Sequence, residues 1–75
     1  MKLSQEPGPI GVFDSGLGGI TVLTELSRLL PHETFIFVGD SARAPYGSRT
    51  PEEIISFLQQ FMDYFQSRGV KMAVC

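Results

Sequence analysis

Polar residues suited to binding a small charged ligand follow two short apolar runs near the start of the chain. Asp14 and Ser15 come directly after Ile10-Gly-Val-Phe13, and Asp40 follows the run that ends at Val38. A carboxylate can face an ammonium group, whereas backbone N–H groups at the start of a helix bind carboxylates and other anions. This pattern therefore favours a small zwitterion or a carboxylate as the ligand.

The loop after Asp40 adds further candidates for the same site. Tyr46 supplies a phenol, and Gly47 leaves its backbone N–H accessible, in a loop long enough to fold back over the strand ends. We expect Arg43 and Arg49, which belong to the same loop, to be solvated.

A structural role is the alternative for each candidate. Asp14 or Ser15 can cap the following helix or form an Asx turn, and Asp40 can hold its own loop through backbone N–H groups. Tyr46 can be a lid residue or a core aromatic whose hydroxyl is satisfied. The residues alone leave both interpretations open.

The glycines of the first loop match part of a phosphate-binding fingerprint. Gly16 and Gly18 fit the first two positions of G-x-G-x-x-G, and Asp40 lies at about the distance where that motif has its acid. However, Thr21 stands where the third glycine belongs, Asp14 adds a negative charge beside the pyrophosphate position, and no G-K-[ST] follows. A nucleotide-binding oxidoreductase is therefore only the second hypothesis, and we expect no cofactor and no metal.

Alternating elements must position these residues. The apolar patterns predict strands at 10–13, 34–38 and 70–75 and helices at 17–30 and 51–68. A β-α-β-α-β order requires crossover helices and a parallel sheet, so the expected fold class is α/β. Ligands of parallel sheets bind outside the carboxyl ends of the strands, which is where both acidic residues lie.

The second helix has the clearest boundaries. Thr50 can cap it, Pro51 suits its first position, and Glu53 completes a capping box. Gly69 fits the position just after its last turn. Apolar residues at helical spacing are expected to pack against the sheet: Ile20, Leu23, Leu26 and Leu30 in the first helix, and Ile54, Leu58, Phe61 and Phe65, widened by Ile55 and Met62 and joined by core Phe57, in the second.

Composition limits the partners and the compartment. The chain has 75 residues, 43% of them hydrophobic, and a net charge of -2. This charge argues against binding to nucleic acid or to an anionic membrane, and no apolar run approaches the ~20 residues of a membrane span. The start has no apolar stretch of the kind found in signal peptides, and a single cysteine fits a reducing cytoplasm.

The chain is expected to divide into a short arm and one incomplete lobe. Residues 1–9, with two prolines and a glycine, predict a flexible arm, and residues 10–75 predict the N-terminal part of a first α/β lobe. We expect the chain to be a piece of a longer protein and to be inactive by itself. The alternative is a module that completes its core by oligomerising.

Three stretches together resemble a known family. "IGVFDSGLGGITVL" (10–23), "FVGDSARAPYGSRTPEEI" (37–54) and "GVKMAVC" (69–75) are similar to the start of the bacterial glutamate racemases, in the aspartate/glutamate racemase superfamily. The pair D-S-G-x-G-G and G-D-x-A-x-x-P-Y-G is much more specific than any glycine motif alone. The resemblance implies the first part of a two-lobe α/β fold.

The resemblance also implies an activity. Glutamate racemases interconvert L- and D-glutamate without a cofactor, by proton transfer between two cysteines that face each other across the substrate, and D-glutamate enters peptidoglycan. For this chain it implies that Asp14, Ser15, Tyr46 and Gly47 contact the substrate, with Asp14 also near the thiol. The parent is expected to be a cytoplasmic homodimer that acts on this small molecule. Another amino-acid racemase of the same superfamily is the alternative.

Cys75 has two possible places in the family's pattern. The third strand of the family resembles K-M-x-V-x-A-C-N-T, in which the cysteine is the reactive thiol. Residues 71–75 match K-M-x-V-x, which puts Cys75 two residues before that thiol and makes it a buried strand residue. If the match shifts by two residues, Cys75 is itself catalytic. We expect the first of these.

Overall fold

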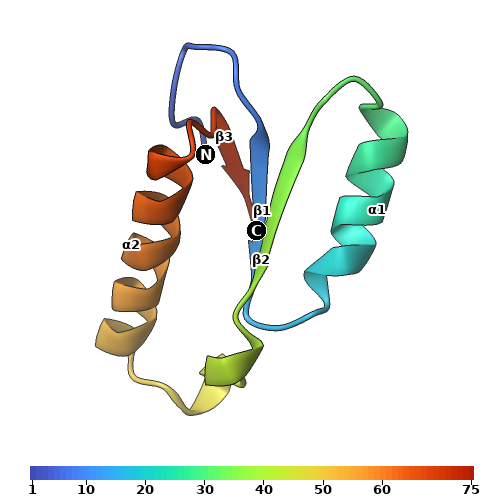
Figure 1. Cartoon of the computed structure of the whole chain (residues 1–75). Helices are drawn as coiled ribbons and strands as arrows, with labels where there is room; N and C mark the ends of the chain where they lie inside the picture. The colour runs from blue at the N-terminus through green and yellow to red at the C-terminus, as the bar shows by residue number, and fades with distance from the viewer.

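A computed structural model describes residues 1–75 and has the expected order of elements (Figure 1). The strands are β1 (Ile10–Asp14), β2 (Phe35–Gly39) and β3 (Met72–Val74), and the helices are α1 (Gly19–Leu29) and α2 (Pro51–Ser67). Two short 3₁₀ turns, Ser41–Arg43 and Tyr46–Ser48, lie between β2 and α2. The sheet is parallel, its strand order is β2-β1-β3, and the two helices lie on opposite faces. This confirms the α/β class.

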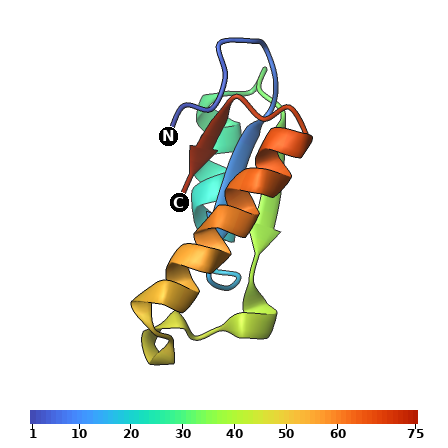
Figure 2. The same cartoon turned by 90° about the vertical axis from the view of Figure 1, so that its left-hand side faces the viewer.

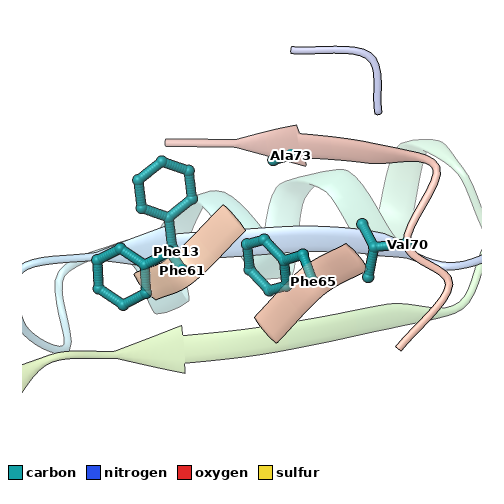
Figure 3. Packing of buried hydrophobic residues seen from close by; sticks show 5 residues of the cluster. All are labelled: Phe13, Phe61, Phe65, Val70 and Ala73. Atoms are coloured by element: carbon teal, nitrogen blue, oxygen red, sulfur yellow. The ribbon is translucent and has the colours of Figure 1, made fainter. Parts of the chain in front are cut away.

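The core lies between the sheet and α2 (Figure 3). The rings of Phe13 on β1 and Phe61 on α2 pack with centroids 5.1 Å apart, and Phe65 is fully buried further along the helix. Val70 and Ala73 close this layer beside β3. Burying a side chain of this size contributes about 1.5–3 kcal/mol, so the phenylalanines of α2 are the principal attachment of that helix to the sheet, as the sequence predicted.

The boundaries of α2 follow the sequence signals. Thr50 Oγ1 accepts a hydrogen bond from the Glu53 N–H at 3.2 Å, and Glu53 Oε1 accepts one from the Thr50 N–H at 3.0 Å, which together make the predicted capping box. Gly69 has a φ of 70°, a left-handed conformation that glycine adopts readily after a helix. Neither helix combines the length and the apolar character needed to cross a membrane.

The apolar faces of the helices are covered less completely than expected. Leu23 and Leu26 of α1 are half-buried, whereas Ile20 is 46% exposed and Leu30, just past the helix end, is 41% exposed. Ile55 of α2 is 65% exposed, so it does not widen the packed face. The contact of α1 with β1 and β2 therefore covers only the middle of its apolar stripe.

The predicted arm runs along the outer edge of β3 (Figure 2). The amino group of Met1 donates to the Ala73 carbonyl at 2.7 Å, and the Ala73 N–H donates to the Met1 carbonyl at 2.8 Å. The Leu3 N–H donates to the Lys71 carbonyl at 2.8 Å. These antiparallel contacts satisfy backbone groups that an edge strand otherwise leaves unpaired.

Candidate functional site

The carboxyl ends of β1 and β2 are level with each other. Asp14 pairs with Gly39 in the parallel register, and the Asp40 N–H donates to the Asp14 carbonyl at 3.0 Å. The two polar runs therefore begin at the same point of the same sheet edge, as expected from the topology. This geometry brings the two loops that follow the strands together.

The β1–α1 loop lies directly against the end of β2. A Cβ added at Gly39 would be 2.5 Å from the Gly16 carbonyl oxygen, closer than real Cβ contacts ever come. Only glycine permits this approach of the two main chains. The close contact at Gly39 thus places Asp14 and Ser15 beside the loop that begins at Asp40.

Asp14 caps helix α1, which is the structural role that the sequence left open for it. Its Oδ2 accepts a hydrogen bond from the Gly19 N–H at 2.9 Å, in the first turn of α1. A carboxylate at this position satisfies one of the free donors of the helix and interacts favourably with the positive end of its dipole. Asp14 also lines the cavity described below, so capping α1 fixes the carboxylate at the rim of that cavity.

The loop after β2 is held by side chains. Asp40 Oδ2 accepts hydrogen bonds from the Tyr46 hydroxyl and from Arg43 Nε, the latter at 2.7 Å. The Arg43 guanidinium also lies 3.9 Å from the centroid of the Phe57 ring and donates to Gln60 Oε1 at 2.9 Å. Arg43 is therefore engaged with α2, and the expectation that it is solvated is wrong.

Arg49 connects this loop to the start of α2. Its guanidinium donates to the Arg43 carbonyl at 3.3 Å and lies 3.4 Å from Glu53 Oε2. The pKa of Glu53 is lowered, chiefly by the hydrogen bond from the Thr50 backbone N–H, then by the Thr50 side chain, with a smaller contribution from Arg49. Arg49 therefore has partners as well, and the expectation that it is solvated is wrong. The Glu53 carboxylate serves both the capping box and the loop.

Tyr46 is held as a neutral donor. Burial, followed by the hydrogen bond to Asp40 and its negative charge, raises the pKa of Tyr46 to about 12. The phenol therefore stays protonated at neutral pH and keeps donating to Asp40. Its ring packs against Phe57 with centroids 5.3 Å apart, so both ends of the side chain are fixed.

A cavity of about 240 Å³ opens at this sheet edge, between the end of β1 and the first half of α2. Its size is suited to a ligand of a few heavy atoms, since pockets for drug-sized molecules are about 300 Å³ or larger. Most of its lining is apolar, and Asp14 and Ser15 are the polar residues that line it. The lining residues are Phe13, Asp14, Ser15, Tyr46, Ile54, Leu58, Phe61 and Cys75.

The cavity gathers most of the residues singled out from the sequence. Asp14, Ser15 and Tyr46 all line it, whereas Gly47 is exposed and does not. The apolar lining by Ile54 and Leu58 was not predicted, although both lie on the expected face of α2. Two further hollows, of about 330 and 420 Å³, lie along the N-terminal arm and contain none of the predicted site residues.

Cys75 differs from the expectation of a buried strand residue. It lies just beyond the last residue of β3, is exposed, and contributes to the cavity lining. The structure therefore places the thiol on the same side as Asp14 and Ser15. No group of three or more histidine, cysteine or carboxylate side chains is arranged to hold a metal ion.

Comparison with known proteins identifies relatives of the whole segment. No protein-family model matches the chain. It is 52% identical over 71 residues to a glutamate racemase of Picosynechococcus, a match that covers 95% of this chain and 25% of that protein. It is 53% identical over 66 residues to a glutamate racemase of Streptococcus sanguinis, which covers 88% of this chain and 25% of that protein.

A solved structure shows the same similarity in three dimensions. Glutamate racemase from Thermus thermophilus, in complex with β-chloro-D-alanine, superposes with a TM-score of 0.82 and 47% identity, over 88% of this chain and 26% of that one. The chain spans about a quarter of the length of the curated relatives that it matches. These matches favour the glutamate racemase hypothesis over a nucleotide-binding fragment. Along nearly all of its own residues, the chain is similar to a segment that makes up about a quarter of these glutamate racemases.

Proposed function

We propose that this chain forms part of an enzyme that interconverts L- and D-glutamate without a cofactor. The observation that carries the proposal is the convergence of Asp14, Ser15, Tyr46 and Cys75 on one small cavity, in a segment about half identical to glutamate racemases. The cavity lies at the carboxyl ends of β1 and β3, and the carboxyl ends of strands are where parallel sheets bind ligands.

The reaction sets demands that this geometry can meet in part. A thiolate removes the α-proton from one face of the amino acid and becomes a thiol, while a thiol on the opposite face delivers a proton and becomes a thiolate. No electrons are gained or lost. The base must be close and positioned, and donors must meet the charge that develops on the carboxylate. Among the residues that line the cavity, we propose Ser15 as the donor for that purpose, through its hydroxyl and its backbone N–H.

This chain supplies one side of the site, and we propose that the other lies in the rest of the parent protein. Side chains two residues apart on a strand point to the same face. In the family motif the reactive thiol stands two residues beyond the position of Cys75, and it takes the same face as Cys75 when the strand continues past Val74. We propose that this further thiol transfers the proton, and that Asp14 lies beside it as a substrate contact.

Ser15, Tyr46 and Gly47 are proposed to contact the substrate as well. Ser15 and Tyr46 are supported by their place on the cavity rim, whereas Gly47 is supported by the family motif alone. We further propose, from the likeness to glutamate racemases, that the D-glutamate produced supplies peptidoglycan synthesis, and that the parent is a cytoplasmic homodimer without nucleic-acid or membrane partners.

A matched pair of carboxylate variants tests the role of Asp14. In the full-length protein that carries this segment, Asp14→Asn keeps an acceptor for the Gly19 N–H and removes the negative charge. We expect kcat for L-glutamate, followed by chiral chromatography, to fall about 100-fold or more. Asp63→Asn, on the exposed face of α2 where Asp63 accepts from Gln59 Nε2 at 3.0 Å, serves as the control and should leave kcat unchanged. Unchanged turnover in Asp14→Asn would remove Asp14 from the mechanism.

A cofactor titration separates the racemase from the second hypothesis. We expect the full-length protein to show no saturable binding of a nicotinamide dinucleotide by calorimetry. Saturable binding together with absent racemisation would favour the oxidoreductase instead.

A further inference from the structure

Arg43 does not line the cavity, yet it contacts Asp40 and Phe57, the two residues that hold the lining residue Tyr46. We propose that Arg43 is a positioning residue, which fixes the Tyr46 side of the cavity against α2 and thereby sets the affinity for the amino-acid ligand. The part of this proposal that concerns affinity rests on the proposed function. The part that concerns the position of Tyr46 does not.

Arg43 makes four interactions, of which two lie within the loop and two join the loop to the helix. Nε donates to Asp40 Oδ2 at 2.7 Å, and Nη1 donates to Gln60 Oε1 at 2.9 Å. The guanidinium carbon lies over the Phe57 ring, 3.9 Å from the ring centroid. The main-chain carbonyl of Arg43 accepts from the Arg49 guanidinium at 3.3 Å. One residue thus links the end of β2 to two successive turns of α2.

Tyr46 completes a closed ring of contacts with the same partners. Its hydroxyl donates to the carboxylate oxygen that Arg43 also contacts, and its aromatic ring packs on the same Phe57, which is only 8% exposed. Tyr46 therefore reaches the cavity rim with both its polar end and its ring held by groups that Arg43 orders. Loss of Arg43 loosens both attachments together.

The Asp40 carboxylate makes this dependence strong. Its side chain is 10% exposed, so little water can reach it, and a charge that is taken out of water needs compensating partners. Without Arg43, the Tyr46 hydroxyl is the remaining side-chain donor to that carboxylate. We therefore expect the loop to open toward solvent so that Asp40 becomes hydrated, which carries Tyr46 away from Phe57.

An arginine suits this position better than a lysine. Its planar, forked guanidinium can donate to Asp40 and Gln60 while lying flat on an aromatic face. A lysine ammonium keeps the charge but cannot satisfy both acceptors in that stacked orientation. Arg43→Lys should therefore retain part of the effect, and Arg43→Met, which keeps the apolar stem, should lose it.

The kinetic test compares two arginines of the full-length protein. We expect Arg43→Met to raise KM for glutamate about tenfold, because the ligand must then order the Tyr46 wall itself. kcat should change less than about threefold, and Arg43→Lys should have an intermediate KM. Arg28→Met is the control, since Arg28 lies on α1 in an exposed pair with Glu25 at 2.8 Å, and it should leave both constants unchanged.

A second measurement follows the position of Tyr46 without any substrate. The ionisation of Tyr46 is read from absorbance at alkaline pH, as the difference between each protein and the same protein with Tyr46→Phe. We expect the pKa of Tyr46 to fall from about 12 toward its ordinary value of 10.0 in Arg43→Met, because the phenol loses its burial and its bond to Asp40. A rigid wall without Arg43 would instead keep the pKa high, because the positive charge that lowers it is gone.

The two measurements separate the possible failures. An unchanged KM and an unchanged Tyr46 pKa in Arg43→Met, in a wild-type protein that racemises glutamate, overturn the positioning role and leave the proposed function intact. A wild-type protein without racemase activity contradicts the proposed function, and the Tyr46 titration then decides the positioning role alone.

Discussion

Replacing Gly39 by alanine tests how closely the ends of β1 and β2 approach each other. The new Cβ would lie 2.5 Å from the Gly16 carbonyl oxygen and 3.1 Å from Cε1 of Phe37, whereas ordinary contact begins at 3.4 Å. The Phe37 ring can turn aside, but the Gly16 carbonyl belongs to the main chain. The β1–α1 loop must therefore move by most of an ångström.

The structure sets the expected size of two effects. Forcing a methyl group into a filled space destabilises the folded protein by about 1–3 kcal/mol. Replacing glycine by alanine also restricts the unfolded chain, which stabilises the folded state by about 0.4–1 kcal/mol. We expect a net loss of about 1–2 kcal/mol in the free energy of unfolding. Misplacing reacting groups by about 1 Å costs about 100-fold in rate. Because Ser15 precedes the displaced Gly16, kcat/KM should fall about tenfold to 100-fold.

Gly16→Ala is the matched control, because it changes the other partner of the same contact. A Cβ on Gly16 has no atom within 4 Å, and its φ is not positive. Its stability should therefore stay the same or rise by up to about 1 kcal/mol. The assay is the melting temperature of the full-length protein without substrate, followed by steady-state kinetics. A Gly39→Ala protein as stable as the wild type, or an equal loss in Gly16→Ala, would refute the close approach of these strand ends.

Three other substitutions in the full-length protein have expected outcomes. Thr50→Ala should lower stability by about 1 kcal/mol at neutral pH through the lost cap. The Thr50 side chain also helps to lower the folded pKa of Glu53, and this contribution to stability is present above the unfolded pKa of Glu53 and lost as pH falls. The difference in melting temperature should therefore narrow in acid to the part due to the Glu53 N–H bond to Thr50 Oγ1. The pKa of Tyr46 is raised from 10.0 to about 12 in the folded protein. Its contribution to the free energy of unfolding is therefore complete below pH 10.0 and is lost as the pH rises toward about 12. Denaturant titrations should therefore show wild type losing stability relative to Tyr46→Phe in that range, and parallel curves would contradict the buried bond to Asp40. Cys75→Ala should keep kcat within about threefold, whereas a loss of about 1,000-fold would assign the proton transfer to Cys75 itself.

Local signals were sufficient for the elements and for the sheet edge at which Asp14 and Asp40 meet. The spacing of Thr50, Pro51 and Glu53 predicts the start of α2 because a capping box needs no distant partner. The order of the elements requires a parallel sheet, and a parallel sheet puts Asp14 and Asp40 at one edge.

Interactions between residues far apart in the sequence could not be predicted from local signals. Arg43 was expected in solvent because nothing local indicates that Phe57 and Gln60 lie opposite it. Cys75 was expected to be buried as a strand residue, whereas β3 ends at Val74 and Cys75 is exposed. How much of the apolar face of α1 is buried likewise depends on which strands the helix meets. The positions of Ile20 and Leu30 in the sequence do not indicate this.

The most direct test of the central proposal is deuterium incorporation at the α-carbon of glutamate. The full-length protein carrying this segment is incubated in deuterated water with L-glutamate or with D-glutamate, with no added cofactor, and both enantiomers are followed by NMR and chiral chromatography. We expect deuterium at the α-carbon and equal amounts of the two enantiomers from either starting material, with aspartate reacting far more slowly. Retention of the α-proton in glutamate, or exchange that begins only when a cofactor is supplied, would contradict the proposal.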